Sequence, residues 1–125
     1  MRKLLANKWK TPDGVILWSK YTHDCQSHID KEGRLFMVDG GNDYIRTSNS
    51  NLMKNLCIYD DGKFSTHREA LLWGRRVGKL IEYIPIKDLE FEHIWNILLT
   101  QKSLGKIYKR CFEDELIYRM GEKVE

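Results

Sequence analysis

The sequence predicts an α+β fold in which a twisted antiparallel β-meander of about five to six short strands is followed by two to three helices. In the first half of the 125-residue chain, acidic-Gly and Gly-Gly steps separate short segments rich in β-branched and aromatic residues. Such steps supply the positive φ that tight hairpin turns need. In the second half, apolar residues recur with the period of an α-helix, so the C-terminal pair of helices is expected to pack on one face of the sheet.

Length and composition predict a single domain over residues 1–125, because 42% hydrophobic and 31% charged residues are typical of a globular protein. The first ten residues lack the apolar run of a signal peptide, and no apolar stretch is long enough to cross a membrane. Three cysteines lie far apart without a CxxC pair, so we expect reduced thiols in a cytosol, without a metal site or a cofactor.

The stretch WKTPDGVILW, residues 9–18, is the clearest predicted hairpin. Pro12 fits the first central position of a type I turn, and Gly14 fits the left-handed position of a bulge. In this register Trp9 lies near Leu17 on the opposite arm.

A second hairpin is expected at THDCQSHI-DKEG-RLFMV. Residues 35–38 are apolar on both faces, which predicts a central strand that is covered on both sides. GGND then turns the chain into a returning strand that begins at Tyr44. Residues 47–55 are predicted to be a loop, and residues 56–59 are predicted to be another short strand.

The second half begins with a predicted short helix, for which Thr66 and Glu69 match a capping box and Gly74 provides the C-terminal stop. Residues 80–86, LIEYIPI, predict a strand, and Pro85 places it at an edge or near its own end.

Two apolar stripes at helical spacing follow. The first stripe comprises Phe91, Ile94, Trp95 and Leu98, and the second comprises Leu104, Ile107, Tyr108, Cys111, Phe112 and Leu116. Ser103 and Gly105 mark a break between two helices, with one kinked helix as the alternative. The stripes hold more large side chains than one sheet face is expected to cover, which leaves surface for a partner or for a homo-oligomer.

The best polar constellation surrounds the second predicted hairpin, where alternate residues from Asp24 to Asp30 share one strand face. The candidates for ligand binding are Asp24, His28, Asp39, Asp43 and Arg46. An Asp-His pair could act as a general base, so a small hydrolase is one alternative. Because no nucleophile or oxyanion hole accompanies the pair, we assign no catalytic residue and favour partnered surface residues.

The stretch VDGGNDYIR contains the only Gly-Gly step of the chain. It matches neither GxGxxG nor GxxxxGK[ST], and a strand is expected after it in place of the helix that a phosphate loop needs. Asp39 and Asp43 would also repel a phosphate, so the stretch is predicted to be a turn between strands.

Basic and aromatic residues alternate on the first two strands, as they would on a sheet that stacks nucleic-acid bases. The candidates are Trp9, Lys10, Trp18 and Lys20. The net charge is only +3 and acidic residues are equally dense nearby. The sequence therefore favours core tryptophans with solvated lysines, and it disfavours a nucleic-acid partner.

Six segments in this order resemble a group of small uncharacterised proteins encoded by tailed bacteriophages: TPDG-x3-WS, HD-x3-H-x-D-x2-G, FMVDGGNDYIR, LCIYDDGKF, LLWG and IPIKDL. The resemblance extends from about Lys8 to the C-terminal helices, and it departs at WGRRVGKLIEYIPIKDL, where a more glycine-rich link is expected. It implies a viral protein in the host bacterial cytoplasm and brings no site residues with it.

The leading hypothesis is therefore a non-enzymatic phage accessory protein that binds or inhibits a host bacterial protein, in host takeover or against host defence. A small-molecule or nucleotide-binding protein, which could act by sequestration, and a small hydrolase are the alternatives.

Overall fold

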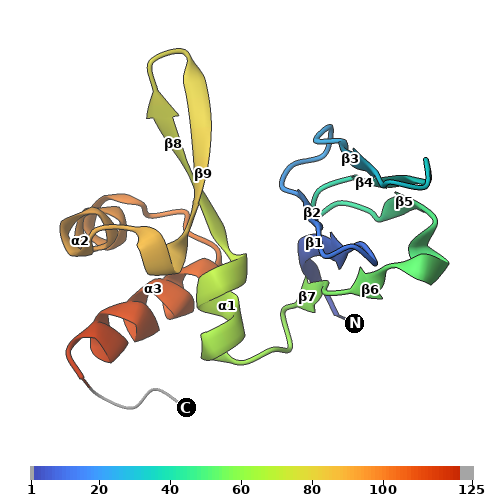
Figure 1. The fold of residues 1–125 in the computed structure, drawn as a ribbon. Helices are drawn as coiled ribbons and strands as arrows, with labels where there is room; N and C mark the ends of the chain where they lie inside the picture. The colour runs from blue at the N-terminus through green and yellow to red at the C-terminus, as the bar shows by residue number, and fades with distance from the viewer. Residues whose placement is uncertain (1, 122–125) are drawn as a thin grey trace. The chain divides into compact units, whose positions relative to one another are not determined.

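The computed structural model describes residues 2–121 and divides into two compact units, Met1–Asp61 and Gly62–Glu125, which are described separately. Three helices and nine strands, all paired antiparallel, are present in the described residues and confirm the predicted α+β class (Figure 1). The strands are more numerous than expected and form three sheets. The sequence gives no sign of the division into units, because Asp61 and Gly62 have the same acidic-Gly pattern as the hairpin turns.

The first sheet of the first unit is built around β1. Its strands are β1 (Leu4–Lys10), β2 (Ile16–Ser19), β6 (Lys54–Asn55) and β7 (Ile58–Tyr59), and β1 pairs with each of the others. Trp9 pairs with Leu17, as the sequence predicts, and Lys8 pairs with Trp18. Gly14 has a φ of 91°, which is the left-handed conformation expected at the bulge of this turn.

The second sheet has β4 at its centre. Its strands are β3 (Gln26–Ile29), β4 (Leu35–Asp39) and β5 (Arg46–Ser48). The second hairpin and the central position of β4 are therefore confirmed. Only one face of β4 is fully buried, because Phe36 and Val38 are 0% exposed whereas Leu35 is 45% exposed. The prediction of a strand covered on both sides is wrong, and the returning strand begins at Arg46 rather than at Tyr44.

The core of the first unit lies between these two sheets. Trp9 and Leu17 of the first sheet cluster with Phe36 and Val38 of the second, and Met53 completes the buried group. The expected loop at residues 47–55 contains a short 3-10 helix at Ser50–Leu52 and the strand β6. Burial of Met53 holds this polar segment against the core, which its composition did not indicate. The strand expected at residues 56–59 is reduced to Ile58–Tyr59.

The second unit joins one hairpin to three helices. Its elements are α1 (Phe64–Ala70), β8 (Leu72–Val77), β9 (Leu80–Pro85), η2 (Ile86–Asp88), α2 (Phe91–Thr100) and α3 (Lys106–Arg119). The hairpin β8–β9 extends away from the helices (Figure 1). The strand β9 and its end at Pro85 are confirmed.

The predicted ends of the first helix are wrong. α1 begins at Phe64 with Lys63 as its N-cap, so Thr66 lies inside the helix, and Lys63 makes no side-chain capping bond. Gly74 lies within β8, paired with Tyr83, instead of ending the helix. Strand pairing here overrides a local sequence pattern that is favourable for a helix terminus.

The break between the last two helices is confirmed, with Gly105 as the N-cap of α3. The stripe predicted on α3 is also confirmed, because its residues Cys111, Phe112 and Leu116 are buried. The stripe predicted on α2 is confirmed only in part: Ile94 is buried and Leu98 is half-buried, but Phe91 and Trp95 are exposed. Ile97, which the stripe does not include, is buried. The sequence FEHIWNILL places apolar residues on both sides of α2, so spacing alone does not identify the buried side.

Candidate functional site

The carboxylate of Asp24 is occupied by contacts within its own loop. One carboxylate oxygen accepts a hydrogen bond from the backbone N–H of Lys20 at 2.8 Å, and the other accepts one from the side chain of Gln26 at 2.6 Å. Asp24 is also 9% exposed, so its side chain is almost entirely covered. These contacts give Asp24 a role in shaping the loop before β3.

Asp39 is fixed in a similar way at the end of β4. Its carboxylate accepts a hydrogen bond from the N–H of Gly40 at 2.8 Å and forms an ion pair with Arg46 on β5. Hydrogen bonding to this carboxylate raises the pKa of Arg46. The structure therefore brings Asp39 and Arg46 together, as cross-strand partners at the start of the GGND turn.

Two buried polar residues of the first sheet hold this turn. The Asn7 side chain donates to the carbonyl oxygens of Asp39 and Tyr44, at 3.0 and 3.2 Å. Ser19 Oγ accepts a hydrogen bond from the N–H of Gly41 at 2.8 Å. Asn7 and Ser19 are 0% and 1% exposed, and sequence analysis missed both because isolated Asn and Ser carry no motif.

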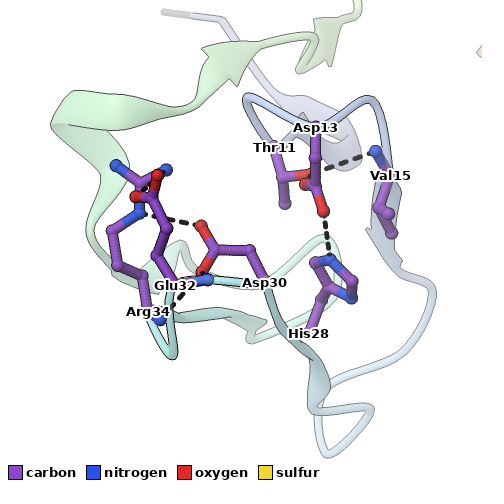
Figure 2. Close-up of polar contacts among 7 residues, drawn as sticks. All are labelled: Thr11, Asp13, Val15, His28, Asp30, Glu32 and Arg34. Atoms are coloured by element: carbon purple, nitrogen blue, oxygen red, sulfur yellow. Dashed lines mark hydrogen bonds and ion pairs between the residues drawn. The ribbon is translucent and has the colours of Figure 1, made fainter.

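Asp43 and His28 have different partners from these residues. Asp43 accepts a hydrogen bond from the hydroxyl of Thr22. His28 Nε2 lies 2.7 Å from the carboxylate of Asp13 in the first hairpin turn, and Asp30 instead bonds Arg34 (Figure 2). Apart from the Asp39–Arg46 pair, the candidates for ligand binding thus lie in separate local contacts, and ligand binding by them stays a prediction.

The Asp13–His28 contact belongs to a larger hydrogen-bonded group (Figure 2). The buried hydroxyl of Thr11 donates to Asp13 and accepts a hydrogen bond from the N–H of Val15 at 3.0 Å. The hydrogen bonds from Thr11 and His28 lower the pKa of Asp13. This group fixes the first turn and ties it to β3, and the spacing of His28 from Asp13 in the sequence gives no hint of it.

We expect Thr11→Val to lower the free energy of unfolding by about 1–2 kcal/mol, because the N–H of Val15 loses its acceptor. Denaturant unfolding followed by tryptophan fluorescence measures this loss. Thr11→Ser keeps the hydroxyl and should stay close to the wild type. A loss in Thr11→Ser without a loss in Thr11→Val would show that the methyl group of Thr11, and not its hydroxyl, stabilises the turn.

The cysteines do not form a reactive group in the described structure. All three are free, and Cys111 is buried in α3. Burial, with smaller effects from Glu115 and Asp114, raises the pKa of the Cys111 thiol to about 12, so it stays protonated at neutral pH. Burial also raises the pKa of Cys57. Within residues 2–121 no three His, Cys, Asp or Glu side chains are grouped as metal ligands.

The four candidates for nucleic-acid contact lie on opposite faces of the first sheet. Trp9 is 8% exposed, and its indole N–H donates to the Asn7 side chain at 3.0 Å, so this ring belongs to the core. The register places Trp18 on the other face, where Lys8 is its direct partner on β1. Lys10, paired with Ile16, lies on that same outer face.

The outer side of α2 exposes large apolar side chains, two of which belong to the stripe that the sequence predicts. Phe91, Trp95 and Leu99 are 46%, 51% and 63% exposed, and they follow one another at i, i+4 and i+8. Ile94 and Ile97 on the inner side are buried, so α2 is apolar on two sides.

Comparisons with protein-family models, with curated proteins and with solved structures found no match to this chain. The resemblance to phage proteins therefore stays a prediction. Among the described residues, no helix has the length and apolar character that a membrane crossing requires.

Proposed function

We propose that this protein is a non-enzymatic binding protein whose helix α2 docks on another protein. The observation that carries the proposal is the exposed line of Phe91, Trp95 and Leu99. Residues four apart lie on one side of a helix, and aromatic and leucine anchors at this spacing are those by which a helix enters an apolar groove. Exposed large aromatic residues are also enriched where protein interfaces concentrate their binding energy.

The fold supports this use of α2 by holding the helix in position. Ile94 and Ile97 are 0% and 5% exposed on its inner side, so the helix is packed before any partner arrives. A preformed helix loses little conformational entropy on binding, which favours affinity. The resemblance to phage proteins suggests a host bacterial protein as the partner, with inhibition or takeover of that protein as the consequence.

The polar groups also favour a binding role over catalysis. The carboxylates of Asp24 and Asp39 are occupied by neighbouring backbone and side-chain donors. The hydroxyl of Thr11 lies beside the Asp13–His28 pair, but it donates to the carboxylate of Asp13. The imidazole of His28 is therefore not placed to act as a general base for this hydroxyl. A hydrolase built on this pair would need a nucleophile from elsewhere, and it remains the alternative.

We expect Trp95→Ala to abolish retention of a bacterial protein that the wild-type chain captures from lysate at physiological salt. Loss of a central aromatic anchor commonly costs 2 kcal/mol or more in binding, which is about 30-fold in affinity. The matched control is Ile29→Ala, which removes an apolar side chain that is 65% exposed on the first unit.

Retention that survives Trp95→Ala, or that disappears equally in Ile29→Ala, would contradict docking through α2. Size-exclusion chromatography of the same variants tests whether the partner is a second copy of the chain. If it is, the wild type elutes as an oligomer and Trp95→Ala elutes as a monomer.

A further inference from the structure

A second surface, distinct from α2, lies on the outer face of the sheet β2-β1-β6. Lys8 and Lys10 of β1 are the cross-strand partners of Trp18 and Ile16, and Lys10 also pairs with Lys54 of β6. Residues that pair across antiparallel strands point to the same face. The Nζ of Lys20 lies 5.2 Å from the centre of the Trp18 ring, which places Lys20 there as well. We call these residues the lysine–tryptophan face: Lys8, Lys10, Trp18, Lys20 and Lys54.

The lysine–tryptophan face carries positive charge without compensation from its own sheet. The strands β1, β2, β6 and β7 contain no Asp or Glu, as their sequences LLANKWK, ILWS, KN and IY show. Within residues 2–121 none of the four lysines takes part in a salt bridge. The mild net charge of the whole chain therefore conceals a local concentration of positive charge.

The aromatic ring of this face, on the edge strand β2, lies close to two of the lysines. The Nζ atoms of Lys8 and Lys20 lie 4.9 and 5.2 Å from the centre of the Trp18 ring. Such cation–π contacts at a partly exposed site are weak, so the flexible lysines can move aside for a flat ligand. A ring with two ammonium groups beside it offers stacking and anion binding at the same place.

We propose that the lysine–tryptophan face binds single-stranded nucleic acid, with Trp18 stacking on a base and the lysines contacting the phosphates. Sheets that bind single strands combine a basic surface with an aromatic platform, because every base has a stacking face and every nucleotide has a charge. A duplex offers no free base face to Trp18, so the single strand is the favoured ligand. Lys8 and Lys10 are about 7 Å apart along β1, which suits contacts to neighbouring phosphates of an extended strand.

The test is fluorescence anisotropy of a labelled oligothymidylate of about 12 nucleotides, titrated with the full chain at several salt concentrations. Wild-type affinity should fall with salt with a log–log slope of up to about −3, since each neutralised phosphate of a single strand contributes about −0.7. Lys10→Gln/Lys54→Gln should reduce the steepness of that slope by about 1.4. The matched control, Lys106→Gln/Lys109→Gln, removes two exposed lysines of α3 and should leave the slope unchanged.

Replacement of the ring separates stacking from charge. Trp18→Leu should weaken binding about 5- to 150-fold at constant salt, whereas Trp18→Phe keeps an aromatic face and should lose less. Unchanged circular dichroism and unfolding midpoints show that the variants remain folded.

Three results would overturn the proposal: no binding at low salt, equal effects of the two double-lysine variants, or an affinity that Trp18→Leu leaves intact. Competition by polyglutamate as effective as that by unlabelled oligothymidylate would indicate an acidic protein partner and would also overturn it.

Discussion

Glu115→Gln is expected to lower the free energy of unfolding of the second unit by about 3 kcal/mol. Glu115 is 0% exposed on α3. Arg68 of α1 donates two hydrogen bonds to its carboxylate, at 2.7 and 2.9 Å, and Arg119 donates a third at 2.7 Å. Glutamine keeps the size of the side chain but leaves two arginines facing a neutral group. Because these arginines are 21% and 22% exposed, the loss should lie at the lower end of that for buried pairs.

The same carboxylate makes the stability of the second unit depend on pH. Burial by itself raises the pKa of Glu115, but the hydrogen bonds from Arg68 and Arg119 outweigh it, so the pKa lies below its ordinary value of 4.5. A carboxylate with a lowered native pKa stabilises the fold fully above the ordinary value, and this stability is lost as the pH falls through the native value. As the pH falls below 4.5, the wild type should therefore lose this contribution to its stability. Glu115→Gln lacks the contribution at every pH, so the difference between the two should shrink in acid.

Hydrogen exchange measured by mass spectrometry assigns the change to the second unit, and denaturant unfolding at several pH values measures its size. Glu113→Gln is the matched control, since Glu113 is exposed on the same helix. It should change stability by less than about 0.5 kcal/mol. Equal losses of stability in the two variants would contradict a stabilising role for the hydrogen bonds that Arg68 and Arg119 donate to Glu115.

Gly41→Ala is expected to destabilise the first unit by about 2–5 kcal/mol, which combines backbone strain with a collision. Gly41 has a φ of 56°, and an added Cβ would lie 2.7 Å from the backbone nitrogen of Thr22 and from Tyr21 Cα. A backbone segment cannot rotate away as a side chain can, so the turn must shift. The shift would also lengthen the hydrogen bond from Gly41 N–H to Ser19.

Gly33→Ala separates the two causes. Gly33 has a φ of 80°, but an added Cβ would meet nothing within 4 Å, so this variant suffers strain alone. It should lose about 1–2 kcal/mol. Denaturant unfolding and hydrogen exchange of the first unit compare the two variants. If Gly41→Ala is no worse than Gly33→Ala, the close packing of the turn against Tyr21 and Thr22 is not important for stability.

The parts of the fold that local chemistry determines were predictable. The register of Trp9 with Leu17 follows from the PDG turn, and the buried side of α3 follows from a single apolar stripe. The ends of α1 and the strand β8 depend on pairing with β9, which no short pattern encodes. On α2 two apolar sides compete, and tertiary packing selects Ile94 and Ile97.

The candidate site was less predictable for a related reason. The basic and aromatic pattern of β1 and β2 suggested Trp9, Lys10, Trp18 and Lys20 as candidates. The register places Lys10 and Trp18 on one face and Trp9 on the other, in the core. Lys54 completes the same face from a two-residue strand that the sequence does not signal. The partner of His28 was also unpredictable, since Asp13 reaches it from a different hairpin.

The contacts of Asn7 and Ser19 have a consequence for the dynamics of the turn at residues 39–46. Both residues belong to the first sheet, whereas the turn belongs to the second, and their hydrogen bonds join the two. The turn therefore cannot open as an independent, low-energy fluctuation, because opening must first break buried hydrogen bonds between the sheets. We therefore expect the buried N–H of Gly41, which donates to Ser19, to exchange with solvent only when the two sheets separate.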